Sequence, residues 1–258
     1  MPRANSSDSS TGQSVWFSQL TDTAAPGAIV CLPYAGMGSA AFSGWRNSKF
    51  DAADIFAAQL PGRDGRLHDP PIDNAVELAG HLADAVSGSP LADRPLTLLG
   101  CSFGGVVAYE LACQLRLRGR NIQHLVVAAC RPPSALSVTD PVASLPDQDM
   151  ISKLQDWYDA IPPEIGNNPD ILELVLPAIR ADMHVYETYA YRDAEPLACP
   201  ITAIGGSDDR MVSINDLHGW QKETSAKFSC RQFAGNHFFV NNQFATVLRY
   251  LQRQIGPR

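Results

Sequence analysis

A glycine-flanked serine is the residue whose setting most directly suggests chemistry. Ser102 lies within Gly100–Gly104 (Gly-Cys-Ser-Phe-Gly), between the apolar run Leu96–Leu99 and a segment with helical spacing. A serine at the apex of such a sharp turn takes a strained backbone conformation, and side chains two residues to either side would clash, which explains both glycines. The turn presents a hydroxyl at a helix N-terminus, where backbone N–H groups favour developing negative charge. The pattern predicts a nucleophilic serine, although a Gly-Ser turn without function would look the same.

A serine hydroxyl is a weak nucleophile until a base removes its proton, and a carboxylate must orient that base. Where a serine stands on a strand-to-helix turn of this kind, the chain order is serine, acid, histidine. His237 lies in a glycine-marked loop after the last predicted strand and is therefore the predicted base. The other histidines precede the acid or follow it too closely: His68, His81, His124, His184 and His218.

Two neighbouring aspartates are candidates for the acid. Asp208 and Asp209 both follow the apolar strand predicted at Ile201–Ile204. An aspartate in a turn often does no more than accept a hydrogen bond from its own backbone, so one of the pair is expected to do so. The residues alone leave the choice between the two open.

An oxyanion would need two backbone N–H groups that converge on one point. One is the N–H of Phe103, directly after the serine, and the other comes from the loop after the buried strand Ala28–Leu32, where Ala35 is the candidate. Cys101 is not expected to act as a nucleophile. The residue before the apex points back into the sheet, so we expect a buried structural thiol there.

The elements around these residues alternate between strand and helix, which predicts a mostly parallel sheet with its site beyond the carboxyl ends of the strands. The expected fold class is α/β, in the form of the α/β-hydrolase fold with helices flanking a central sheet. Strands are expected at about 14–17, 28–32, 54–60, 96–99, 124–129, 201–204 and 227–233, and helices at 75–86, 104–117 and 247–255.

Residues 132–196 interrupt this alternation. Apolar residues recur at helical spacing from Met150 to Tyr158, and a second apolar stretch, Ile171–Ile179, is expected to be broken by Pro177. We expect a helical lid over the site, whose apolar stripe, Met183 included, lines the pocket. Residues 1–13 are Ser-rich and are expected to form a disordered tail before a single domain at 14–258.

Composition excludes several classes of function. The 258 residues carry a formal net charge of −7 without a basic stripe, so no nucleic-acid partner is expected. The six cysteines are scattered without a Cys-x-x-Cys pair, which predicts buried free thiols in a reducing compartment and no metal site. No signal-peptide pattern or apolar run long enough to span a membrane occurs. We therefore expect a cytoplasmic monomer without a membrane partner, metal or cofactor.

Longer motifs make the chain resemble a known family, the type II (stand-alone, editing) thioesterases that accompany polyketide and nonribosomal peptide synthases. The resemblance runs from about Val15 to Ile255. The motifs that carry it are Leu32–Gly36, Gln59–Arg63 with Arg66, Pro177–Asp182 with Glu187–Tyr189, Gly206–Val212 and Gly235–Phe239.

The resemblance implies an activity and its residues. A member of this family hydrolyses acyl thioesters on the phosphopantetheine arm of an acyl or peptidyl carrier protein, and so clears stalled or aberrant acyl groups without a cofactor. The resemblance implies Ser102 as nucleophile, His237 as base, and the Ala35 and Phe103 N–H groups as oxyanion donors. It also favours Asp209 as the acid, because the family's acid stands three residues after a glycine and three before a valine, as Asp209 does here.

This chain departs from the family pattern at two positions. Cys101 and Tyr34 each stand where the family usually has histidine. Both positions border the predicted nucleophile or the oxyanion loop, so substrate preference and rate are open to change. Three other functions compete: a thioesterase that releases product by cyclisation or acyl transfer, a small-molecule carboxylesterase with the same triad, and a catalytically silent binding protein. The complete triad argues against the last.

Overall fold

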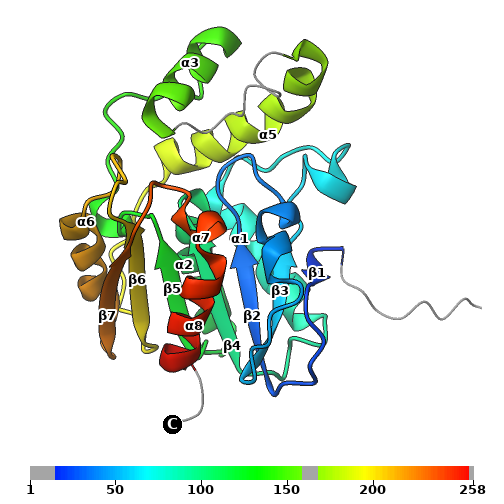
Figure 1. The fold of residues 1–258 in the computed structure, drawn as a ribbon, viewed down its shortest axis with the longest axis vertical. Coiled ribbons are helices and arrows are strands. Elements are labelled where there is room, and N and C mark those ends of the chain that lie inside the picture. Colours follow the sequence, from blue (N-terminus) through cyan, green and yellow to red (C-terminus); the bar gives the residue numbers. More distant parts are fainter. Residues whose placement is uncertain (1–14, 159–167, 256–258) are drawn as a thin grey trace, which may run out of the picture.

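A mostly parallel sheet forms the centre of the molecule (Figure 1). The computed structural model describes residues 15–158 and 168–255. In this part of the chain the sheet has seven strands in the order β1-β3-β2-β4-β5-β6-β7. The strands are β1 (Phe17–Gln19), β2 (Gly27–Leu32), β3 (Ala53–Ala58), β4 (Leu96–Cys101), β5 (His124–Ala128), β6 (Ile201–Gly206) and β7 (Phe228–Phe233). All neighbours pair in parallel except β1, which is antiparallel to β3. The predicted fold class is confirmed.

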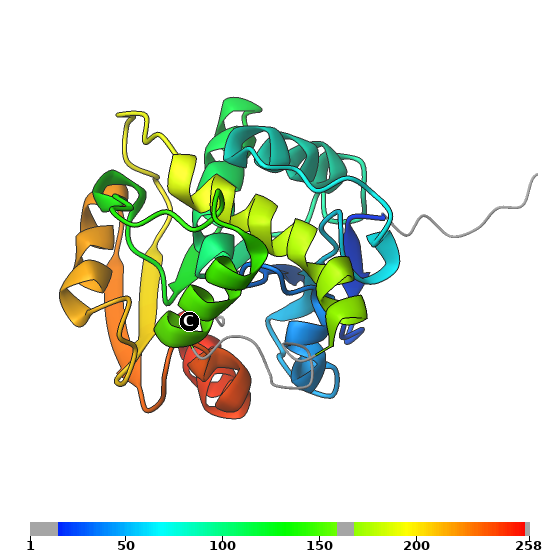
Figure 2. The ribbon, with the colours of Figure 1, turned by 90° about the horizontal axis from the view of Figure 1, so that it is seen from above.

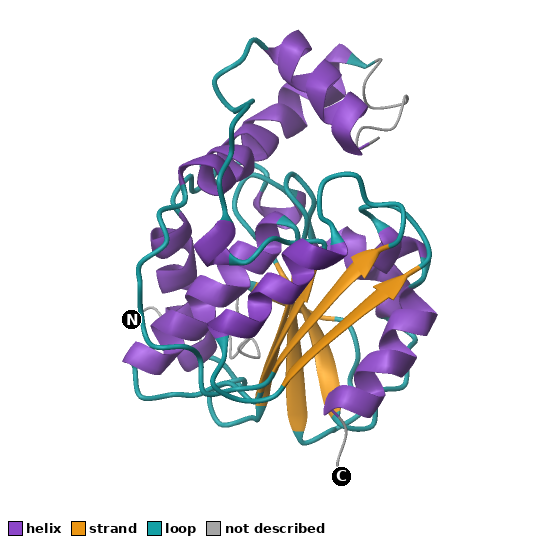
Figure 3. Cartoon of the chain, turned by 90° about the vertical axis from the view of Figure 1, so that its left-hand side faces the viewer, coloured by secondary structure: helices purple, strands orange, loops and turns teal. Residues whose placement is uncertain are grey.

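Helices cover both faces of this sheet (Figure 3). On one face lie α1 (Ala75–Ser87), α2 (Phe103–Leu117) and α6 (Ile214–Gly219), and on the other lie α7 (Phe239–Asn242), α8 (Phe244–Ile255) and the 3₁₀ helix Ser39–Trp45. Because successive strand residues point to opposite faces, β2 contributes Val30 to one core and Ile29 to the other. Continuous apolar strands are therefore needed at the centre of the sheet.

Two further helices lie beyond the carboxyl ends of the strands. These are α3 (Asp147–Tyr158) and α5 (Pro169–Thr188), both in the chain between β5 and β6. Seen from above, α5 crosses over the sheet (Figure 2). The two helices and the segment just before α3 share a small apolar cluster: Val142, Ala143, Met150, Leu154, Leu176 and Met183. The expected tail at 1–13 and the 159–167 part of the expected lid lie outside the described residues.

The expectation that Pro177 breaks its helix is wrong, because α5 runs through it without interruption. A proline inside a helix costs about 3 kcal/mol, since it removes one N–H and crowds the carbonyl four residues earlier. That carbonyl belongs to Glu173, which is exposed. Burial of each large apolar side chain contributes about 1.5–3 kcal/mol, and the buried ones on α5 include Leu176, Met183 and Val185. Tertiary packing therefore outweighs the local penalty.

Capping side chains fix the starts of two helices. The Asn74 side chain accepts hydrogen bonds from the first-turn N–H groups of α1, and Asn168 does the same for α5. Each cap satisfies N–H groups that have no partner inside the helix, a contribution of about 1 kcal/mol. Pro169 at the first position of α5 adds a preset backbone angle.

The first strand also differs from the expectation. The sequence placed it at Ser14–Phe17, whereas β1 begins at Phe17 and Ser14 lies outside the described residues. Phe17 pairs with Ala58 and turns its ring into the core, and this burial sets the register. Across residues 15–158 and 168–255, no helix combines the length and apolarity needed to cross a membrane.

Candidate active site

The turn at Ser102 has the strained geometry that its neighbours suggested. Ser102 has φ 52° and ψ −118°, between the end of β4 and the start of α2. A Cβ atom at Gly100 would overlap the Gly104 carbonyl oxygen, and one at Gly104 would overlap the Leu32 carbonyl oxygen. Only glycine fits at either position, as predicted. The Ser102 N–H donates to the Ala128 carbonyl at 2.8 Å, which ties the turn to the neighbouring strand.

The hydroxyl of Ser102 begins a chain of hydrogen bonds. His237 Nε2 lies 2.9 Å from Ser102 Oγ, and His237 Nδ1 lies 2.8 Å from Asp209 Oδ2. The three side chains come from the loops after β4, β6 and β7, which meet at the carboxyl edge of the sheet. Asp208 is exposed, whereas the Asp209 carboxylate is fully buried behind the imidazole.

Asp209 is held as an anion. Burial raises the pKa of Asp209, but the hydrogen bond and charge of His237 and two backbone N–H groups lower it further, so the pKa lies below the usual range. Those N–H groups belong to Met211 and Val212, at 2.9 and 3.2 Å from Asp209 Oδ1. An ionised carboxylate accepts a hydrogen bond from the N–H at Nδ1, which keeps the proton on that nitrogen and leaves Nε2 free to accept a proton from the Ser102 hydroxyl.

The loop that carries Ala35 packs directly against the start of α2. The overlap that a Cβ at Gly104 would have with the Leu32 and Pro33 carbonyls shows how closely the two backbones approach. Phe103 is the first residue of α2, so its N–H has no partner within the helix. Ala35 and Phe103 line the same cavity as Ser102 and His237. The structure thus brings together all five residues singled out from the sequence.

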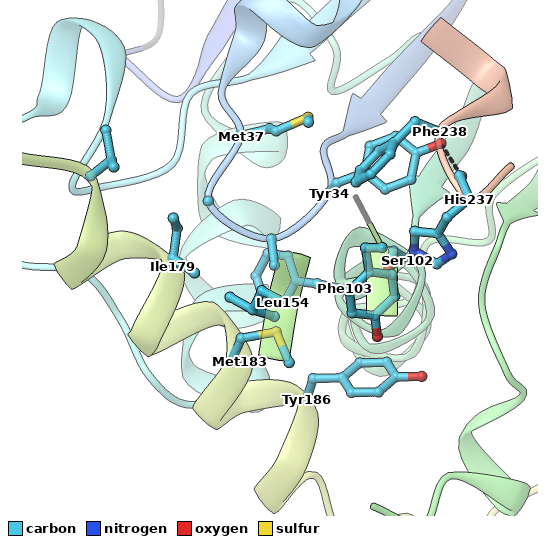
Figure 4. A pocket seen from close by; sticks show the side chains of 14 residues that line it. Tyr34, Met37, Ser102, Phe103, Leu154, Ile179, Met183, Tyr186, His237 and Phe238 are labelled. Carbon is cyan, nitrogen blue, oxygen red and sulfur yellow. Dashed lines mark hydrogen bonds between the residues drawn. The ribbon is translucent and has the colours of Figure 1, made fainter. Parts of the chain in front are cut away.

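An apolar cavity of about 230 Å³ opens beside Ser102. Figure 4 shows Ile179, Met183 and Tyr186 projecting from α5 into it, with Leu154 of α3 nearby. Met183 lines this cavity, as expected from its place in the apolar stripe. An acyl chain bound here would lie against side chains that offer few polar groups.

Comparison with known proteins identifies the family of this chain. Residues 28–255 match the thioesterase domain family. The chain belongs to this family. It is 30% identical over 242 residues to the gramicidin S biosynthesis protein GrsT of Aneurinibacillus migulanus, covering 93% of each chain. It is 31% identical over 220 residues to the thioesterase PikA5 of Streptomyces venezuelae, covering 85% of this chain and 77% of that protein.

Solved thioesterase structures are similar over nearly the whole chain. RedJ, from the prodiginine biosynthetic pathway in Streptomyces coelicolor, superposes with a TM-score of 0.83 at 31% identity and covers 98% of this chain and 97% of that one. YbtT, a type II thioesterase from the yersiniabactin NRPS/PKS pathway, gives a TM-score of 0.84 at 28% identity, with 93% and 98% covered. The resemblance to type II thioesterases is confirmed.

Tyr34 and Cys101 are the two positions at which the sequence was expected to depart from the family pattern. The Tyr34 hydroxyl donates to the backbone carbonyl of His237 at 3.2 Å, and its ring packs against His237 and Phe238 (Figure 4). Cys101 is fully buried, and burial raises the pKa of its thiol to about 12. The thiol therefore stays neutral, as expected of a structural cysteine rather than a nucleophile.

Sequence reasoning missed two contacts of the thioesterase site. The Tyr158 ring at the end of α3 lies 4.7 Å from the His237 ring, and Asp182 on α5 contacts the Ala35 loop through Gly36. Nothing in the sequence around Tyr158 predicts its contact with His237. Asp182, by contrast, is an acidic residue on the same helix face as Ile179 and Tyr186, and a buried acidic residue on an apolar face needs a partner.

Among residues 15–158 and 168–255, no cluster of three or more His, Cys, Asp or Glu side chains is arranged to hold a metal ion. The six cysteines are free thiols, four of them buried.

Proposed function

We propose that this thioesterase hydrolyses acyl thioesters on the phosphopantetheine arm of an acyl or peptidyl carrier protein, and so clears stalled or aberrant acyl groups from a polyketide or nonribosomal peptide synthase. The observation that carries the proposal is the hydrogen-bonded chain Ser102–His237–Asp209 at an apolar cavity. The relatives support the carrier-bound substrate, since YbtT is named for an NRPS/PKS pathway and GrsT for gramicidin S biosynthesis.

Acylation is the first half of the reaction. Ser102 Oγ attacks the thioester carbonyl carbon while His237 Nε2 takes the hydroxyl proton. The carbonyl oxygen becomes an oxyanion, which the N–H groups of Ala35 and Phe103 stabilise. Collapse of this intermediate breaks the carbon–sulfur bond, and His237 returns the proton to the departing sulfur. Thiol pKa values near about 8.5 make the pantetheine thiol a good leaving group.

Deacylation repeats these steps with water. His237 takes a proton from water as its oxygen attacks the acyl-enzyme carbonyl, and the same two N–H groups hold the second oxyanion. Breaking the bond to Ser102 Oγ releases the free acid, and the proton returns to the serine. The Asp209 carboxylate stabilises the imidazolium that forms in both halves, and no metal or cofactor enters the scheme.

Intact-protein mass spectrometry of an acyl-loaded carrier protein tests the proposal. Wild-type enzyme should return the carrier to its free-thiol mass and release the acyl group as the free acid. Ser102→Ala should remain folded by circular dichroism and lose at least about 1,000-fold in rate. A variant that keeps substantial activity would contradict the role of Ser102. If the wild type cleaves simple oxygen esters but leaves the carrier untouched, the protein is a carboxylesterase instead.

A second candidate is product release by cyclisation or acyl transfer. This chain is 33% identical over 230 residues to the AMB antimetabolite synthetase AmbE of Pseudomonas aeruginosa, of which it covers only 11%, so a similar domain also occurs inside a synthetase. The two functions differ in whether water or a substrate nucleophile attacks the acyl-enzyme. The released product decides between them, because the free acid is heavier than the cyclised product by one water.

We further propose that residues 14–258 act as one domain and that the protein is a monomer in the cytoplasm. Free buried thiols fit a reducing compartment. Among the described residues, the exposed large apolar side chains lie on three separate segments: Val15, Leu117, and Ile171 with Leu174. Sedimentation velocity of the purified protein would reveal a dimer if this proposal is wrong.

A further inference from the structure

A buried ion pair joins α5 to the loop that carries Ala35. The Asp182 side chain is 1% exposed and the Arg63 side chain 7%. Arg63 donates from both Nη atoms to the two Asp182 oxygens, with 2.9 Å between Nη2 and Oδ1. Asp182 Oδ2 also accepts the backbone N–H of Gly36 at 2.8 Å. Gly36 directly follows Ala35, so this hydrogen bond fixes the peptide plane between the two residues.

The same ion pair holds the far end of the loop. Arg63 Nη1 donates to the Met37 carbonyl at 3.3 Å, while Arg63 Nε donates to the Pro61 carbonyl at 3.1 Å. Within the loop, the Met37 N–H donates to the Tyr34 carbonyl at 3.0 Å. Residues 34–37 therefore form a tight turn, and the Arg63–Asp182 pair ties it to the rest of the molecule.

Helix α5 also packs directly against this turn. Gly36 has φ +71°, and a Cβ atom there would overlap the Ile179 side chain. Ile179 precedes Asp182 by three residues, so both face the turn from adjacent helical turns. In Figure 4 Ile179 projects from α5 toward this loop.

We propose that Asp182 is a positioning residue for the oxyanion hole: its carboxylate, balanced by Arg63, holds the Gly36 amide and so aims the Ala35 N–H at the reacting carbonyl. The proposal rests on the proposed function, which makes Ala35 an oxyanion donor. It gives a role to two residues, Arg63 and Asp182, that take no part in the proton transfers. Arg63 is needed as well, because an unpaired carboxylate beside the oxyanion hole would oppose the developing negative charge.

The expected effect is a loss of turnover rather than of substrate binding. Removing one oxyanion donor costs about 10²–10³-fold in kcat. The hydrogen bond to the oxyanion strengthens only in the transition state, so kcat and kcat/KM should fall together. We expect Asp182→Ala to lower kcat about 100-fold with KM within about threefold. Asp182→Asn keeps one acceptor oxygen for the Gly36 N–H and should recover part of that loss.

Because breaking a buried pair costs about 3–5 kcal/mol, the single variants could unfold. The double variant Arg63→Met/Asp182→Leu avoids this problem. Replacing a buried ion pair by apolar side chains of similar size is often neutral or stabilising. This variant removes the acceptor for Gly36 while filling the space, so it should keep its melting temperature and still lose about 100-fold in kcat.

A matched control exists at the opposite edge of the sheet. Asp54 is 2% exposed, and its carboxylate accepts the Thr23 N–H at 2.7 Å and Arg94 Nη2 at 2.7 Å. Like Asp182, it is therefore a buried aspartate shared between an arginine and a backbone amide. Asp54→Ala should lower the melting temperature while leaving kcat per folded molecule within about threefold of wild type.

The experiment measures two rates for each folded variant. One is hydrolysis of the acyl-loaded carrier protein, and the other is labelling of Ser102 by a fluorophosphonate, in which the Oγ–P bond forms and fluoride leaves. The labelling passes through an oxyanion too, but it requires no carrier protein. We expect both rates to fall about 100-fold in the double variant and to stay near wild type in Asp54→Ala.

The possible outcomes separate the two proposals. Wild-type labelling rates in the double variant, or an equal loss of rate in Asp54→Ala, would overturn the role of Asp182. A wild-type enzyme that takes the label but spares the carrier thioester would overturn the proposed function, while the labelling rates would still decide on Asp182. A wild-type enzyme that resists labelling would overturn both.

Discussion

The two edges of the sheet carry the same pair of groups, but only one pair is arranged for chemistry. At the carboxyl edge, buried His237 lies 2.9 Å from the Ser102 hydroxyl. At the amino edge, His124 is equally buried and lies 2.8 Å from the hydroxyl of Thr202. Burial and a hydroxyl partner therefore do not distinguish a reactive histidine from a structural one.

The two histidines differ in the groups that surround the imidazole ring. His237 has the Asp209 carboxylate 2.8 Å from its other nitrogen. Burial, reinforced by the charge of Lys227, lowers the pKa of His124 to about 4, so His124 cannot hold a proton at neutral pH. Thr202 lies inside β6, whereas Ser102 occupies a strained turn at the start of α2.

The larger of the two cavities at these edges is not the one beside Ser102. A cavity of about 420 Å³ at the amino edge is lined by Asp51, Gln123 and His124 together with apolar residues that include Pro95 and Ile255. The cavity beside Ser102, of about 230 Å³, is smaller, but Ser102 and His237 both line it. The lesson is that convergent groups identify the site better than volume does.

Replacing each histidine in turn tests most directly whether His237 is catalytic and His124 structural. His237→Ala should lower kcat by about 10⁵-fold or more, because the base serves both halves of the reaction. His124→Gln should leave kcat within about threefold. Initial rates on an acyl-loaded carrier protein measure both, and comparable losses in the two variants would show that the edges do not differ as described.

A smaller effect is expected from the carboxylate. Asp209→Asn should lower kcat about 10⁴-fold, because the amide stabilises the wrong tautomer of His237 and cannot balance the imidazolium. The exposed neighbour gives a matched control, and Asp208→Asn should retain nearly full activity. The opposite ranking in the same assay would assign the acid to Asp208.

The smallest effect concerns stability at the amino edge. An unfolded histidine has a pKa near about 6.5, so between that value and about 4 the unfolded chain binds a proton that folded His124 does not. The free energy of unfolding should therefore decrease as the pH is lowered through this window, by at most about 3 kcal/mol from this group. Urea unfolding at pH 7, 5.5 and 4.5 should show a shallower decline for His124→Gln than for wild type. Parallel declines would refute the shift.

Much of the site could be predicted because its rules are local. The steric demands of the turn at Ser102 involve only residues 100–104, so the glycine spacing carries them. The order of Ser102, Asp209 and His237 is the one expected where a nucleophilic serine stands on a strand-to-helix turn of this kind. The choice of Asp209 over Asp208 needed the family pattern, because both aspartates occupy the same turn and only the folded chain orients them.

The sequence by itself therefore determined the fold class and the turn at Ser102, indicated His237 as the base, and limited the acid to Asp208 or Asp209. Only the tertiary structure decided that α5 continues through Pro177, that Tyr158 packs on His237 and that Asp182 holds Gly36. The physical reason is the distance along the chain over which each interaction acts. Steric rules act over a few residues of backbone, whereas these contacts join distant segments whose meeting depends on how the whole core packs.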